Sequence, residues 1–117
     1  MTRAEPESNQ QANFDELIRI LSDSYRAVDP ARDIVPKLYF LDPQILNNQS
    51  VELIAKTAFR RDPGLLIDIA SGLLRAPLES QRHYVNVIEQ LDPNWLAVNR
   101  DSLEEILFGP IDQMDWR

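Results

Sequence analysis

Residues 62–75 read Asp-Pro-Gly-Leu-Leu-Ile-Asp-Ile-Ala-Ser-Gly-Leu-Leu-Arg, and this stretch decides the fold class. From residue 64 onward, leucine, isoleucine and alanine fill every position outside one narrow stripe at helical spacing, which comprises Gly64, Asp68, Ser71, Gly72 and Arg75. A helix that is apolar around most of its circumference is buried among other elements. We therefore expect residues 64–75 to form a helix at the centre of an all-α protein.

Amphipathic helices are predicted on both sides of this central helix. The first begins after an N-cap at Asn13, and its apolar residues recur every three or four positions: Phe14, Leu17, Ile18, Leu21, Tyr25 and Val28. Further helices are predicted over residues 51–61 behind a Ser50 cap, over 78–91, and over 101–108, where a capping box opens the helix.

Asp-Pro pairs separate these helices, at residues 29–30, 42–43, 62–63 and 92–93. An Asp side chain can accept a hydrogen bond from a free N–H of a first helical turn, and the proline beside it lacks only an N–H that would have no partner. Gly109-Pro110 is predicted to end the last helix. Between residues 30 and 41 we expect a short helix from Asp33, with Pro36 in its first turn; a strand over 37–41 remains the alternative.

Length and patterning indicate one domain. The chain has 117 residues, within the about 100–150 that single domains most often have. No stretch alternates polar and apolar residues as a half-buried strand would. We expect a compact single-domain bundle of five or six short helices, with a short α-solenoid as the alternative. Residues 1–12 are predicted to be a disordered segment, 13–108 the helical domain, and 109–117 an acidic, aromatic C-terminal tail.

Composition excludes several classes of function. The absence of cysteine removes disulfides, thiolate nucleophiles and cysteine-ligated metals. No apolar run approaches the about 20 residues of a membrane-spanning helix, and the first residues lack the apolar segment of a signal peptide, so we expect a cytoplasmic protein without membrane contact. The net charge is −7 and the arginines are dispersed, which argues against direct nucleic-acid binding.

Candidate catalytic chemistry is sparse. His83 is the only histidine, and Glu79 precedes it by four residues on the same helical face, so these two residues could contribute to a metal or carboxylate site. No third ligand is indicated, and no nucleophile or phosphate-binding motif is present. We expect no enzyme, metal or cofactor; a small enzyme with a carboxylate and His83 site is the alternative.

The C-terminal part of the chain is the predicted partner-binding surface. Residues 101–117 contain five acidic residues and one arginine, and large apolar residues alternate with the acids in the tail. Such a segment suits pockets on a basic partner protein, although Met114 and Trp116 could instead complete this protein's own core. The candidate residues are Glu104, Glu105, Phe108, Ile111, Asp112, Met114, Asp115 and Trp116.

The stripe on the central helix is a second candidate contact surface. Gly64, Ser71 and Gly72 permit close approach of another helix, from this chain or from a second copy, and Asp68 could pair with an arginine. The sequence thus predicts a small acidic protein-binding module: an adaptor, an assembly or regulatory factor, or an immunity-type inhibitor. A homo-oligomeric structural protein is a further alternative.

Overall fold

The computed structural model describes residues 6–23 and 25–115, and the side chains of residues 10–23 and 25–109. These residues form six α-helices and one π-helical turn and contain no strand, so the prediction of an all-α bundle is confirmed. The Cα radius of gyration of 14.5 Å is close to the about 13 Å of a compact chain of this length. In chain order the elements are α1 (Pro6–Ser22), η1 (Pro30–Ile34), α2 (Val35–Tyr39), α3 (Asn48–Arg61), α4 (Leu65–Gly72), α5 (Leu78–Leu91) and α6 (Pro93–Asp115).

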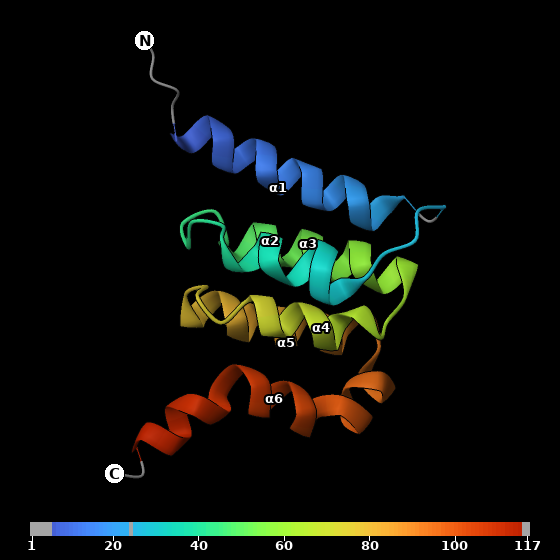
Figure 1. Cartoon of the computed structure of the whole chain (residues 1–117). Coiled ribbons are helices and arrows are strands. Elements are labelled where there is room, and N and C mark those ends of the chain that lie inside the picture. Colours follow the sequence, from blue (N-terminus) through green and yellow to red (C-terminus); the bar gives the residue numbers. More distant parts are fainter. Residues whose placement is uncertain (1–5, 24, 116–117) are drawn as a thin grey trace.

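The helices are stacked in chain order from one edge of the molecule to the other (Figure 1). α2 and α4 lie in front of α3 and α5, α1 forms one edge and α6 forms the opposite edge. α1 packs on α2 and α3, α2 packs on α4, α3 packs on α4 and α5, and α6 packs on α4 and α5. The packed helices are therefore neighbours or next-but-one neighbours along the chain.

The predicted central helix is central in the structure. Leu66, Ile69 and Ala70 of α4 are completely buried, and the buried Tyr84 hydroxyl of α5 donates a 2.7 Å hydrogen bond to the Leu66 carbonyl. The core draws side chains from every element, because each helix presents one apolar face inward. The largest fully buried side chains are Tyr84, Leu17, Ile20, Leu21, Ile34, Leu38, Leu41, Leu46, Ile54, Leu66, Ile69 and Leu73.

Helix α1 begins two turns earlier than predicted. Residues 6–12, expected in a disordered segment, are helical from Pro6, and proline is favoured at a first helical position. The Asp42 N–H donates a 2.8 Å hydrogen bond to Gln10 Oε1, which ties this part of α1 to the loop after α2. That contact joins residues far apart in the chain, so local pattern could not reveal it. Residues 1–5 lie outside the described part.

The stretch from Pro30 to Tyr39 is helical, and no strand forms over residues 37–41, so the alternative strand is wrong. The helical path begins at Pro30 rather than Asp33, and it opens with the π-helical turn η1. The Val35 N–H donates to the Pro30 carbonyl, five residues back. A proline ring clashes with the carbonyl four residues before it, and the wider π turn directly ahead of Pro36 relieves that conflict.

Asp-Pro pairs mark helix starts as predicted at two places. The Asp29 carboxylate accepts from the Ala31 N–H at the start of η1, and the Asp92 carboxylate accepts from the Trp95 N–H at the start of α6. At α3 the predicted Ser50 cap is wrong, because the Asn47 side chain is the N-cap and accepts from the Ser50 N–H at 2.9 Å.

Helix α6 is longer than predicted at both ends. It starts at Pro93 and passes through Asp101 without a break, because the buried Leu96, Leu103 and Leu107 continue one apolar face. It also continues through Gly109-Pro110 to Asp115, so residues 109–115 are helical and not a separate tail. Proline inside a helix removes one backbone hydrogen bond and bends the axis, and Figure 1 shows the red end of α6 at an angle to its orange start.

Candidate interaction site

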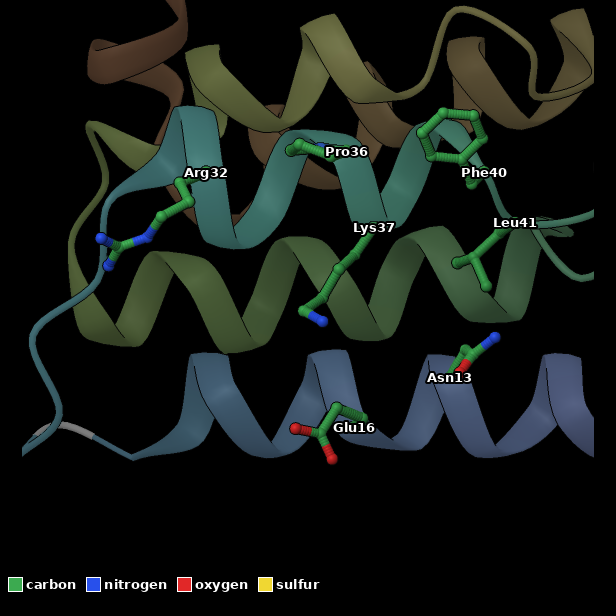
Figure 2. Close-up of a pocket in the computed structure, with 7 residues that line it drawn as sticks. All are labelled: Asn13, Glu16, Arg32, Pro36, Lys37, Phe40 and Leu41. Carbon is green, nitrogen blue, oxygen red and sulfur yellow. The ribbon is translucent and has the colours of Figure 1, made fainter.

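A groove of about 340 Å³ lies between α1 and α2. Figure 2 shows its lining: Asn13 and Glu16 come from α1, and Lys37 extends from α2 toward them. We call this feature the α1–α2 groove. Its lining residues are Asn13, Glu16, Arg32, Pro36, Lys37, Phe40 and Leu41.

An aromatic pair stands at the end of α2 beside this groove. The Phe40 side chain is 73% exposed and Tyr39 is 42% exposed. Their rings meet edge to face, with centroids 5.7 Å apart and an interplanar angle of 89°. The Arg75 guanidinium lies 5.6 Å from the centre of the Tyr39 ring and donates a 2.9 Å hydrogen bond to the Tyr39 carbonyl. Arg75 therefore holds Tyr39 in place, and Phe40 is left open to solvent.

The charges along the groove are partly paired. Arg32 forms two hydrogen bonds with Asp33, at 2.9 and 3.0 Å. These bonds and the Asp29 N–H hold the pKa of Asp33 well below its usual range. Glu16 pairs with Arg19. Among the described side chains no ion pair includes Lys37, so Lys37 is the cation that the groove presents to a ligand.

The predicted partner-binding residues of α6 have different surroundings. Glu104 pairs with Arg100 at 3.1 Å, whereas Glu105 is exposed. Phe108 is half-buried and packs against the core, so it does not form a free apolar surface. Four further candidates lie in the last turns of α6, but their side chains are outside the described part: Ile111, Asp112, Met114 and Asp115. Trp116 lies beyond the described residues.

The exposed face of α6 also contains residues that the sequence reasoning missed. Val98 is 83% exposed, and Asp101 is exposed one turn further along the helix. With Glu105 these residues follow the three- and four-residue spacing of one helical face. That spacing was present in the sequence, and the predicted break at Asp101 concealed it.

The stripe on α4 is divided between the interior and the surface. Gly72 is buried against α2, where an added Cβ would lie 2.8 Å from Leu38 Cβ. The helix that approaches closely therefore comes from this chain. Asp68 and Ser71 are half-buried, and Gly64 and Arg75 are exposed.

Two arginines close to Asp68 in the sequence make other contacts. Arg75 binds the Tyr39 carbonyl, and Arg61 donates to the carbonyls of Ile20, Asp23 and Arg26 at the end of α1 and in the loop that follows. None of the ion pairs among the described side chains includes Asp68.

His83 lies next to a different carboxylate from the predicted one. Its Nε2 is 3.1 Å from Glu52 Oε1 on α3, and Lys56 Nζ lies 2.8 Å from Glu52 Oε2. Hydrogen bonds from Lys56 and His83 lower the pKa of Glu52. Glu79 instead accepts a hydrogen bond from Asn48 at 3.4 Å. Among the side chains of residues 10–23 and 25–109, no three His, Asp or Glu groups come together as a metal site would require.

Comparison with known proteins gives no match to a family model, to a curated protein or to a solved structure. No helix of the described chain is both long enough and apolar enough to cross a membrane.

Proposed function

We propose that this chain is a small acidic protein-binding module, which acts by docking onto another protein and not by catalysis. The observation that carries the proposal is the exposed Phe40 beside the α1–α2 groove. A single exposed apolar side chain is ordinary on a protein surface. Here, however, the phenylalanine adjoins a second aromatic ring, a cation and a concave surface. Aromatic residues and arginines set beside a pocket are typical of the residues that contribute most to protein–protein binding.

The acidic charge of the molecule supports a second contact region on α6. Helix α6 contains five acidic residues and one arginine, and the exposed Val98 lies on the same helical face as Asp101 and Glu105. Carboxylates around an apolar side chain favour a partner whose contact surface is basic, because charge complementarity accelerates and orients the encounter. We propose that such a partner contacts α6 and the C-terminal tail.

Affinity purification from the native host tests the proposal. The full-length chain is compared with Phe40→Ser, with a chain truncated after Gly109, and with Tyr25→Ser as a matched control. Tyr25 is a fully exposed aromatic residue outside the groove. We expect Tyr25→Ser to retain every captured protein and at least one of the other two variants to lose a partner, which is then purified and titrated directly. If both retain every partner with unchanged affinity, the proposed binding surfaces are wrong.

A further inference from the structure

We propose that the α1–α2 groove of one copy binds the C-terminal tail of a second copy, so that the chain associates head to tail. This inference rests on the proposed function, because it names the partner protein as a second copy of this chain.

The groove and the tail have complementary chemistry. After Gly109-Pro110 the tail reads Ile-Asp-Gln-Met-Asp-Trp-Arg, so that Asp112 and Asp115 alternate with Ile111, Met114 and Trp116. The groove presents the Lys37 cation together with the apolar surfaces of Pro36, Phe40 and Leu41. A carboxylate beside the Lys37 ammonium gains a charge-assisted contact. Indole and thioether groups both interact favourably with an aromatic ring such as that of Phe40.

The size of the groove also suits such a segment. Its volume of about 340 Å³ lies near the lower end of the about 300–1,000 Å³ of ligand pockets. A groove of that size accepts one or two large side chains, which the last turn of a helix can supply.

A copy cannot place its own tail in its own groove. The groove lies at the α1 edge of the stack, and α6 forms the opposite edge (Figure 1). α6 packs on α4, and α4 packs on α2, so two helix-to-helix spacings of about 8–10 Å each separate α6 from α2. The tail is part of α6 as far as Asp115, so it stays at that edge of the molecule. The tail that fills the groove must therefore come from another molecule.

A contact between two different surfaces leaves one groove and one tail unused in every dimer. Association of this type continues to longer chains unless the geometry closes a ring. The contact area is small, so we expect a weak, reversible interaction of the transient class. The weight-average mass of the assemblies should then rise with protein concentration. It should reach about twice the monomer mass when the total protein concentration equals the dissociation constant of a single contact.

Sedimentation velocity of the full-length protein over about 10 μM to about 1 mM, in low salt, measures this rise. Two variants each disable one side of the contact: Lys37→Glu in the groove, and Asp112→Asn combined with Asp115→Asn in the tail. Lys37 is exposed, so its substitution should leave the thermal unfolding curve unchanged, which circular dichroism verifies.

We expect each variant alone to remain monomeric. Mixed in equal amounts, the two should form a dimer and nothing larger, because the mixture contains one intact groove and one intact tail per pair. Tyr25→Ser should associate like the unsubstituted chain.

The inference is overturned if the full-length chain stays monomeric up to about 1 mM, if Lys37→Glu associates as strongly as the unsubstituted chain, or if the mixed variants form no dimer. A monomeric chain that still captures a different protein through Phe40 would remove the second copy as the occupant and leave the proposed function intact. If the chain neither self-associates nor captures a different protein through Phe40, both proposals are wrong.

Discussion

Gly72 on α4 lies in direct contact with Leu38 on α2, with no room for a side chain between them. An ideal Cβ on Gly72 would be 2.8 Å from Leu38 Cβ and 3.2 Å from the Val35 carbonyl oxygen. The first of these atoms is next to the backbone and the second belongs to it, so neither can move without shifting α2. The absence of a side chain at Gly72 therefore lets α2 approach α4 closely at this point.

Gly72→Ala should therefore destabilise the protein by about 1–3 kcal/mol, the usual cost of overpacking. Alanine gains at most about 1 kcal/mol over glycine in a helix, and Gly72 is the last residue of α4, where that gain is smaller. Urea unfolding followed by circular dichroism measures the change. Ser71→Ala, at the half-buried neighbouring position, is the matched control and should stay within about 0.5 kcal/mol. Equal effects of the two substitutions would contradict the packing explanation.

Arg61→Met should cost about 1–3 kcal/mol, because it leaves three backbone carbonyls around the end of α1 without their charged donor. Arg61→Lys keeps the charge but not the planar fork that reaches several carbonyls at once, so we expect an intermediate loss. Arg60→Met removes the exposed neighbouring guanidinium and serves as the control, with a change within about 0.5 kcal/mol. Chemical unfolding of the three variants distinguishes them, and a similar loss for both methionine variants would refute the specific role of Arg61.

Tyr84 should make stability fall at alkaline pH. Burial and, to a smaller extent, the Asp68 carboxylate raise its pKa well above the usual 10.0. Above about pH 10 the unfolded chain releases the phenolic proton and the folded chain retains it, so rising pH favours unfolding. Tyr84→Phe should remove this pH-dependent loss, and it should cost about 0.5–1.5 kcal/mol at neutral pH through the missing hydrogen bond to Leu66.

Unfolding midpoints between about pH 8 and about pH 11 test this prediction. Phenolate absorbance provides a second readout, because Tyr84 should ionise only on unfolding. A pH dependence that persists unchanged in Tyr84→Phe would show that another group causes it.

Gln81→Glu should destabilise the protein in a pH-dependent manner. The buried Gln81 Nε2 donates to the carbonyls of Leu73, Leu74 and Ala76, at 2.9, 3.3 and 3.3 Å. A carboxylate at this position would face three acceptors, so its folded-state pKa should rise above the unfolded value of about 4.3. The penalty should be small below that value and should grow as the pH rises through the folded-state pKa.

Gln81→Met separates the two effects in that experiment, because it loses the hydrogen bonds without adding a charge. We expect its cost to be independent of pH, at about 1–3 kcal/mol for the hydrogen bonds lost to these carbonyls. Urea unfolding of both variants at about pH 4 and about pH 8 gives the comparison. A cost of Gln81→Glu that did not change with pH would contradict the prediction.

The sequence was sufficient to identify most of the helices but not their limits. The apolar circumference of residues 64–75 correctly predicted a central helix, and Asp29 and Asp92 correctly marked helix starts. Helix ends that were predicted wrongly depend on tertiary contacts, such as the hydrogen bond between Gln10 and Asp42, or on a proline being tolerated inside a helix. Neither can be recognised from a local sequence pattern.

The candidate site was harder to predict because it joins remote parts of the chain. The α1–α2 groove needs Glu16 and Lys37 from different helices, and His83 meets Glu52, 31 residues away, instead of the nearby Glu79. One signal of the site was present in the sequence. If residues 34–41 are placed on a helix, Ile34, Leu38 and Leu41 share its apolar face, and Phe40 falls on the exposed face. The predicted role of the acidic tail remains a prediction.

The chain-order stacking of the helices has a consequence for how the protein is made. Because packed partners lie close together along the chain, each new helix emerging from the ribosome finds its neighbours already synthesised. Folding that depends on such local contacts is fast, within microseconds to milliseconds, whereas translation adds only about 5–20 residues per second. We therefore expect α1 to α4 to dock progressively during synthesis, with α6 closing the exposed side of α4 and α5 last.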